Sequence, residues 1–210
     1  MTYALSHITT NDERLSLLVS YVGEIRLRQR DDLFRFVVCE IVGQMLSSKV
    51  KHTLVNRLIE LCNNSITPGA ILSLGEVKLK GIGISSAKCS YIIGFAERVQ
   101  SGELDLDSLR NMGDEEAVKV LTQLKGIGSW TAKMVLLFAL GRENVLPYED
   151  VAFQQGYKWL YNIGAADKDE IIVRAKNWEP YCSIASLYIY ECVNQGLIKL
   201  SPDILLQGKY

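Results

Sequence analysis

Helix-start signals recur along this chain of 210 residues, whereas the alternation of apolar and polar residues that is typical of β-strands is scarce. Each signal is a residue whose side chain can accept a hydrogen bond from a first helical turn, placed before an apolar segment or before proline. These cap candidates are Asn11 or Asp12, Asp31 or Asp32, Thr67, Asp167 and Ser201. We count about ten expected helices with short connections, so the sequence predicts an all-α fold with no appreciable β-sheet.

The composition is that of an ordinary globular protein, with 48% apolar and 22% charged residues. No apolar run approaches the roughly 20 residues of a membrane-spanning helix. The first residues, MTYALSHITTNDER, lack the basic start and apolar core of a secretory signal. We therefore expect a cytoplasmic monomer with no membrane partner.

The five cysteines do not form a disulfide framework or a metal-binding pattern. Their number is odd, and no two lie within nine residues of each other, which excludes the spacings of zinc and iron–sulfur ligands. We expect reduced, buried thiols, no iron–sulfur cluster and no required cofactor.

The basic residues are unevenly distributed, although the formal net charge is only −1. Segments 41–59, 77–91 and 122–133 together contain eight of the 23 Lys and Arg residues and no Asp or Glu. Because a polyanion is recognised by local charge rather than by the sum, this distribution is compatible with a nucleic-acid partner.

The pentapeptide LKGIG occurs twice, as Leu79–Gly83 and Leu124–Gly128, and each copy precedes an apolar segment. In the second copy, Gly126 and Gly128 allow the positive φ values of a tight turn, and Ser129 can cap the next helix. We expect the same geometry in the first copy. Backbone N–H groups at such a turn can bind an anion, but a helix–turn–helix corner without a ligand explains the loop alone equally well.

The second copy continues into LKGIGSWTAKMVLLFALGRENVLPYED, residues 124–150, which resembles the hairpin and catalytic segment of the helix–hairpin–helix DNA glycosylases. Within that superfamily it is most similar to the 3-methyladenine DNA glycosylase II branch, which excises alkylated bases. Four more segments resemble that branch in the family's order: GQMLSSK, GISSAKCSYI, GELDLDSL and WEPYCSIASLYIY. The resemblance therefore rests on five ordered motifs that cover most of the chain.

The resemblance implies a single glycosylase domain, residues 1–210, with two helical lobes around a DNA-binding cleft. Lobe one would comprise about residues 31–141, including the hairpin 124–129, and lobe two about residues 1–30 and 142–210. The implied function belongs to base excision repair. A monofunctional DNA glycosylase flips an alkylated base, such as 3-methyladenine, out of duplex DNA and hydrolyses its N-glycosidic bond.

The reaction needs one well-placed carboxylate, because breaking the bond leaves an oxocarbenium-like sugar. By its position in LPYEDVAFQQ, Asp150 matches the family's catalytic acid. Glu149 is the alternative, since an offset of one residue would exchange the two roles. Without the resemblance, the pair reads as acids at a helix N-terminus.

The implied base pocket is aromatic, because alkylated bases are electron-poor and often cationic. Trp130 and Tyr190 match pocket aromatics of the family, and Tyr148 lies nearby in the sequence. Met134 stands where the branch often has an aromatic residue. Core packing is the alternative interpretation for the aromatic side chains.

An extruded base leaves a gap that an apolar side chain commonly fills. Met45, after Gln44, matches the family's wedge position, with a core methionine as the alternative. The hairpin and the start of the next helix would grip the DNA backbone. The residues expected at this contact are Lys125, Gly126, Ile127, Gly128, Ser129, Thr131 and Lys133, with Lys49 also in reach of phosphates.

The family's hairpin also holds a monovalent cation, Na⁺ or K⁺, through backbone carbonyls. The matching carbonyls are those of Thr122, Leu124 and Ile127. Two residues depart from the family pattern. Lys125 replaces the usual hairpin proline, and Cys182 replaces an arginine that the family uses near the catalytic segment.

Glycosylases that also cut the strand carry a lysine at the second position after the hairpin's last glycine. Trp130 occupies that position and Lys133 lies three residues further on, so the sequence predicts hydrolysis without a Schiff base. This disfavours an 8-oxoguanine-type glycosylase. A non-catalytic helix–hairpin–helix DNA-binding protein, the other alternative, would need neither Asp150 nor the aromatic residues.

Overall fold

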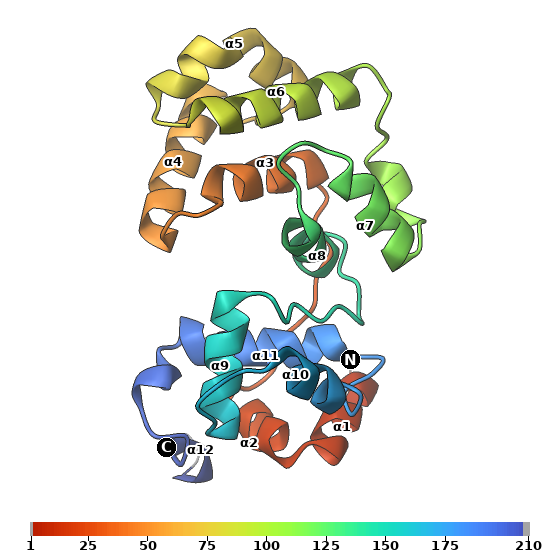
Figure 1. The fold of residues 1–210 in the computed structure, drawn as a ribbon, viewed down its shortest axis with the longest axis vertical. Helices are drawn as coiled ribbons and strands as arrows, with labels where there is room; N and C mark the ends of the chain where they lie inside the picture. Colours follow the sequence, from red (N-terminus) through yellow and green to blue (C-terminus); the bar gives the residue numbers. More distant parts are fainter. Residues whose placement is uncertain (1, 208–210) are drawn as a thin grey trace. The chain divides into compact units, whose positions relative to one another are not determined.

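The computed structural model describes residues 2–207, which are built from helices and connecting turns (Figure 1). The described residues contain no strand, so the all-α fold class is confirmed. Within that range, no helix is both long and apolar enough to cross a membrane. The helices are α1 (Thr2–Asn11), α2 (Glu13–Val22), α3 (Leu33–Gly43), α4 (Ser48–Leu61), α5 (Pro68–Gly81), α6 (Ser86–Gln100), η1 (Asp107–Arg110), α7 (Asp114–Thr122), α8 (Ser129–Phe138), α9 (Val151–Tyr161), α10 (Lys168–Ala175), α11 (Cys182–Asn194), η2 (Leu197–Lys199) and α12 (Ile204–Gln207), where η marks a 3₁₀ helix.

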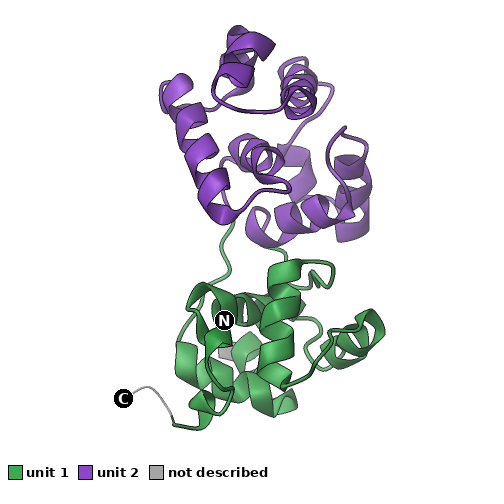
Figure 2. Cartoon of the chain, turned by 60° about the vertical axis from the view of Figure 1, so that its left-hand side comes forward, with its two compact units in different colours: residues 1–29, 141–210 green, residues 30–140 purple. Residues whose placement is uncertain are grey.

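The chain folds into two compact units (Figure 2). Unit 1 combines the residues up to Gln29 with those from Gly141 onward, and unit 2 is the continuous segment Arg30–Leu140. The boundaries expected from the sequence, residues 31 and 141, each lie one residue from those of unit 2. Each unit has a buried apolar core of its own.

Helix α3 is the centre of unit 2 and packs against α4, α6 and α8. Its buried residues are Leu33, Phe34, Val37, Val38, Ile41 and Val42. Phe34 stacks on Phe95 of α6 with ring centroids 4.9 Å apart. Burying each side chain of this size stabilises the fold by about 1.5–3 kcal/mol. Two further helix pairs, α5 with α6 and α7 with α8, are each joined by one of the LKGIG segments.

Helices α9 and α11 pack against each other in unit 1, and α2 packs against both. Gly156 of α9 permits the contact, since a Cβ at this position would overlap the backbone carbonyl of Ile189 in α11. The Tyr188 hydroxyl of α11 donates to the carbonyl of Gly23 (2.9 Å) and accepts from the amide of Ile25 (3.2 Å). The segment that leaves α2 is thereby fixed to α11.

Asp12 ties three elements of unit 1 together. One carboxylate oxygen caps α2 by accepting the Leu15 amide (3.1 Å). The other accepts the Trp178 indole N–H (3.0 Å) and the Tyr161 hydroxyl (2.7 Å). Burial and the Asp12 carboxylate raise the pKa of Tyr161 well above its ordinary value, so the hydroxyl remains a donor. Asp12 is 8% exposed, so its charge is buried together with its donors.

Four of the expected helix caps are confirmed, because Asp12, Asp32, Thr67 and Asp167 each accept an amide of the first turn. The expectation for Ser201 was wrong. Helix α12 begins at Ile204, and the Ser201 hydroxyl accepts no amide of that helix. It accepts the Asp203 amide before the helix (3.3 Å) and donates to the Asp203 carboxylate (3.0 Å). Helix α1 was not expected, because TYALSHITTN offers neither a cap nor a continuous apolar face.

Gly156→Ala should destabilise the protein, because the new Cβ forces α9 away from α11. Overpacking of this kind costs roughly 1–3 kcal/mol, which corresponds to a drop in Tm of about 2–12 °C for a chain of this size. Gly164→Ala is the matched control, since no atom lies within 4 Å of its added Cβ. Equal melting temperatures for the two variants would contradict the packing.

Candidate active site

The second LKGIG copy forms the hairpin between α7 and α8. Helix α7 ends at Thr122, and α8 begins at Ser129 with Gly128 as its N-cap. Gly126 has a φ of 85°, whereas Gly128 has a φ of −92°. The expectation that both glycines would adopt positive φ is therefore wrong for Gly128. The cap assigned to Ser129 is also wrong, because Ser129 is already the first helical residue.

The first copy does not share this geometry, contrary to our expectation. Helix α5 continues to Gly81, and the positive φ, 102°, falls on Gly83. The Ser85 hydroxyl then caps α6. Trp130 stands at the position in the second copy that Ser85 occupies in the first. Without that cap the second helix starts two residues earlier relative to the motif, so identical pentapeptides form different turns.

The hairpin is held from inside unit 2 by two side chains. The side-chain amide of Gln44, at the end of α3, donates to the Gly126 carbonyl (2.6 Å) and to the Thr131 hydroxyl (3.3 Å). The Tyr91 ring of α6 lies directly against Gly126, where a Cβ would overlap it. Glycine is thus required at position 126 both by the left-handed backbone and by Tyr91.

The turn between α3 and α4 presents an exposed apolar residue in an unusual conformation. Met45 is 101% exposed and has a φ of 56°. This excludes the core-methionine interpretation. The left-handed region costs a residue with a side chain roughly 1–2 kcal/mol, and such strain clusters at functional sites. Leu46 and Val50, 36% and 44% exposed, extend the apolar surface beside it.

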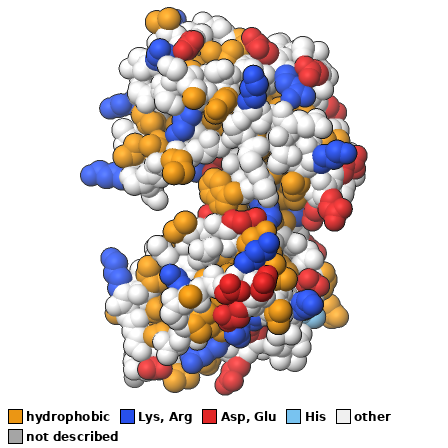
Figure 3. Space-filling view, in the orientation of Figure 1, with side chains coloured by type: hydrophobic (Ala, Val, Ile, Leu, Met, Phe, Trp, Pro, Cys, Tyr) orange, Lys and Arg blue, Asp and Glu red, His pale blue; other side chains and the backbone are white. Residues whose placement is uncertain are grey.

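The three acid-free segments of the sequence meet in unit 2. Gln44 joins the first to the hairpin. The Lys88 ammonium of the second donates to the carbonyls of Val42 and Gln44 in the first. The Arg57 guanidinium donates to the carbonyl of Ile82 at the earlier LKGIG turn. Lys and Arg side chains are visible on the side of unit 2 where α4 lies, and others are spread over the rest of the same face (Figure 3).

The residues expected to grip a DNA backbone differ in accessibility. Lys49, Lys125, Gly128 and Ser129 are exposed, while Gly126 and Lys133 are half-buried. Thr131 and Ile127 are 3% and 4% exposed. The Thr131 hydroxyl is engaged with Gln44, so its side chain supports the hairpin rather than facing a ligand. Because the Ile127 side chain is buried, only the backbone of this residue can contact a ligand.

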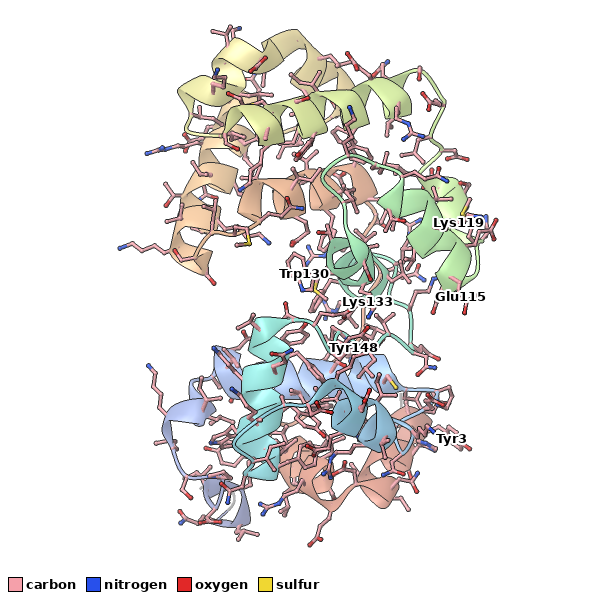
Figure 4. The ribbon with its side chains drawn as sticks, in the orientation of Figure 1. Tyr3, Glu115, Lys119, Trp130, Lys133 and Tyr148 are labelled. Carbon is pink, nitrogen blue, oxygen red and sulfur yellow. The ribbon has the colours of Figure 1, made fainter. Side chains whose placement is uncertain are left out.

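The expected pocket residues of unit 2 lie on α8. Trp130 is half-buried, and both Trp130 and Lys133 extend from this helix (Figure 4). Met134 is 4% exposed and belongs to the run of buried residues that anchors α8. The burial of Met134 favours a packing role in unit 2.

The hairpin backbone is compatible with the expected monovalent cation. Thr122 ends α7, where helix carbonyls lack an intrahelical donor. The Leu124 carbonyl accepts the Ile127 amide (3.0 Å) and retains a second lone pair. These carbonyls thus have acceptor capacity for an ion that prefers oxygen ligands.

In unit 1, Asp150 is the N-cap of α9. One carboxylate oxygen accepts the Phe153 amide (2.9 Å), and the Asp150 amide donates to the Pro147 carbonyl (2.9 Å). The Gln154 side chain of the same helical turn donates to the Tyr148 carbonyl (2.9 Å). The carboxylate is therefore held at the positive end of the α9 dipole. The residues just before it are fixed by hydrogen bonds from Asp150 and Gln154.

The two aromatic residues expected near Asp150 lie in the same unit. Tyr190 of α11 packs edge-on against Phe153, with ring centroids 6.1 Å apart. Phe153 is the residue whose amide the carboxylate caps, so Tyr190 lies beside the first turn of α9. The Lys168 ammonium is 5.3 Å from the centroid of the Tyr148 ring, a cation–π contact.

The segment that leads to Asp150 is fixed to the start of α11 by residues that sequence reasoning missed. The Val145 amide donates to the buried Ser183 hydroxyl (2.9 Å), and the Ser183 amide donates to the Glu143 carbonyl (2.9 Å). The Asn144 side chain accepts the Cys182 amide (3.4 Å). No local sequence signal identifies these contacts, because they join positions 38 to 40 residues apart.

Cys182, at the position where the resemblance implies an arginine, is a buried thiol. It is 3% exposed, and burial raises its pKa to about 12. At neutral pH it is therefore an uncharged packing group. The backbone of Cys182 and the side chain of Ser183 provide the connection to the segment before Asp150.

The expected site residues thus form two groups, one in each unit. Unit 2 contains the hairpin, Met45 and Trp130, and unit 1 contains Asp150 with Tyr148 and Tyr190. Residues 38–181 match the family model of the HhH-GPD superfamily of base excision DNA repair proteins. The chain belongs to this superfamily. The matched residues include the hairpin in unit 2 and Asp150 in unit 1.

Relatives of similar sequence and structure carry related names. A Bacillus subtilis relative whose name describes a DNA-3-methyladenine glycosylase is 32% identical over 161 residues, which are 73% of this chain and 56% of that protein. The chain thus spans little more than half the length of this relative. The crystal structure of a Bacillus halodurans DNA-3-methyladenine glycosidase has a TM-score of 0.82 at 33% identity, covering 97% of this chain and 95% of that one. A Schizosaccharomyces pombe 3-methyladenine DNA glycosylase in complex with abasic DNA has a TM-score of 0.84 at 26% identity, with coverages of 95% and 98%.

Ser183→Ala should destabilise unit 1 more than Ser186→Ala does, although both serines are fully buried in α11. Removal of the Ser183 hydroxyl leaves the buried Val145 amide without its acceptor, at a cost of about 1–3 kcal/mol. The Ser186 hydroxyl donates to the Cys182 carbonyl within its own helix (2.7 Å), so removing this hydroxyl leaves no buried donor without an acceptor. Thermal unfolding of the two variants measures the difference, and a larger effect of Ser186→Ala would contradict this role of Ser183.

Proposed function

We propose that this protein is a DNA glycosylase that removes alkylated bases of the 3-methyladenine class from duplex DNA. The observation that carries the proposal is the anchored carboxylate of Asp150, at the N-terminus of α9 in a chain of the HhH-GPD superfamily. The names of the relatives, which describe 3-methyladenine glycosylases, support the substrate class.

Asp150 acts on the sugar rather than on the base. As the N-glycosidic bond breaks, positive charge develops on the deoxyribose, and the carboxylate stabilises it and orients the attacking water. At ~4 Å and an effective dielectric of ~20, such a pair gains about 4 kcal/mol, on the order of a thousandfold in rate. Anchoring by the Phe153 amide means that the carboxylate does not reorganise during the reaction.

Aromatic side chains select the base. An alkylated, electron-poor base gains stacking and cation–π attraction from an aromatic side chain. The candidates are Trp130 in unit 2 and Tyr190 in unit 1, and Tyr148 lies two residues before the proposed catalytic acid. The Lys168 ammonium, 5.3 Å from the centroid of the Tyr148 ring, supports this proposal, because it forms with that ring the kind of cation–π contact that a cationic base would form. A neutral, undamaged base gains less from the same surfaces.

The DNA partner is held by unit 2. Lys125 and Ser129 at the hairpin and Lys49 on α4 contact phosphates, together with the exposed backbone of the hairpin. Met45 inserts into the gap left by the flipped base, which accounts for its full exposure. Carbonyls of Thr122, Leu124 and Ile127 would hold a monovalent cation, which supplies positive charge opposite a phosphate when it is bound.

Asp150→Asn should abolish base release from alkylated duplexes, a loss on the order of a thousandfold, with DNA binding retained. Asparagine caps a helix as well as aspartate does, so this substitution removes the charge while keeping the bond to Phe153. Asp150→Ala removes both, and should also cost about 0.5–2 kcal/mol of stability. Glu149→Gln is the control and should retain most of the activity. Near-normal turnover by Asp150→Asn would contradict the assignment.

Binding to duplex DNA should weaken with salt despite the net charge of −1. With about four phosphate contacts, log affinity should fall against log salt with a slope of about −3.6. Fluorescence anisotropy of a labelled duplex at several salt concentrations measures the slope. A slope near zero would exclude a phosphate-gripping surface.

Sodium borohydride should trap no covalent adduct between the protein and damaged DNA. Trp130 occupies the position at which strand-cutting relatives carry their lysine, so no amine forms a Schiff base there. Denaturing gel electrophoresis after borohydride treatment detects such an adduct. Trapping that disappears in Lys133→Met would show that lyase chemistry exists and uses Lys133.

A further inference from the structure

Lys88 connects α6 to the end of α3 in a way that the proposed reaction does not yet use. It lies in the first turn of α6, and its ammonium donates to the carbonyls of Val42 (2.8 Å) and Gln44 (2.7 Å). The group is partly buried, and desolvation lowers its pKa from the ordinary lysine value. A solvated surface lysine would show neither feature.

The two carbonyls lie where α3 terminates. Val42 belongs to the last turn, whose carbonyls have no intrahelical donor, and a cation there also complements the helix dipole. The Gln44 carbonyl belongs to the peptide group that joins Gln44 to Met45. Because that group is planar, fixing its oxygen fixes the plane from which the Met45 φ angle is measured.

Gln44 is held at its other end as well, since its side chain donates to the Gly126 carbonyl of the hairpin (2.6 Å). We propose that Lys88 is a positioning residue, which holds the peptide before Met45 so that this side chain stays in its exposed, left-handed conformation. The inference rests on the proposed function for the wedge role of Met45. The claim that Lys88 fixes the conformation of Met45 concerns the free protein and does not depend on that function.

The first measurement uses the full chain without DNA. Backbone chemical shifts of Gln44, Met45 and Leu46 report the conformation of the turn and are compared between wild type and Lys88→Met, which keeps the side-chain length and removes the donors. We expect changes at these three residues, restoration in Lys88→Arg, and no change in Lys78→Met, a control at an exposed lysine on α5. Unchanged Met45 shifts in Lys88→Met would overturn the proposal.

If Lys88→Met fails to fold, Lys88→Gln replaces it, since glutamine is polar but too short to reach both carbonyls. The backbone chemical shifts of Gln44, Met45 and Leu46 are compared again with those of the wild type, and we expect changes at all three residues. Unaltered shifts at Met45 in Lys88→Gln would likewise overturn the proposal.

The second measurement asks whether Lys88 acts through Met45. Base release from a duplex is compared with release from the corresponding single strand, where no gap has to be filled. Lys88→Met should lower the duplex rate by about tenfold, with little effect on the single strand, and should cause no further loss in a Met45→Ala background. Independent, multiplying effects would overturn the proposal by showing that Lys88 does not act through Met45. If the wild type releases no base, the proposed function fails, and the chemical shifts still decide the role of Lys88.

Discussion

The hydrogen bond from the Phe153 amide to the Asp150 carboxylate is the constraint on which the candidate chemistry depends. Through this bond the Asp150 side chain is both the N-cap of α9 and the proposed catalytic group. Helix α9 is in turn fixed by its close contact with α11, where Gly156 allows the backbones to meet. Ser183 at the start of α11 holds the segment that leads to Asp150. The packed core of unit 1 therefore fixes the position of the carboxylate. Electrostatic stabilisation of a developing charge requires a group that is held in place in this way.

In unit 2, the hairpin and the end of α3 are held in place through their backbone groups. Gln44, Tyr91 and Lys88 contact the hairpin or the end of α3, and each contact involves a glycine or a carbonyl. A site that presents backbone N–H groups and one apolar side chain suits a ligand that is recognised by its phosphates and by a gap in its stack. The net charge of −1 does not oppose this, because the acids lie outside the three segments that meet here.

The fold class and most helix caps could be predicted from the sequence, because caps and apolar periodicity are local signals. The position of Asp150 at a helix N-terminus follows from the same signals, whereas its catalytic role rests on the family resemblance and stays a prediction. The predictions failed where distant residues decide the outcome. Identical LKGIG segments differ because Ser85 can cap a helix and Trp130 cannot. Thr131 was expected at a surface, but it is buried beneath Gln44, a residue 87 positions away. The roles of Lys88 and Ser183 depend on carbonyls and amides of other elements, which no pattern in their own neighbourhood reveals.

The proposed glycosylase activity can be tested by identifying the product that the wild-type protein forms from duplex DNA containing 3-methyladenine or 7-methylguanine. Chromatography separates free base from nucleoside and nucleotide. We expect the release of free methylated base and an otherwise intact strand with one abasic site. Tight binding to these duplexes with no base released from any of them would contradict it, and would leave a DNA-binding protein without glycosylase activity.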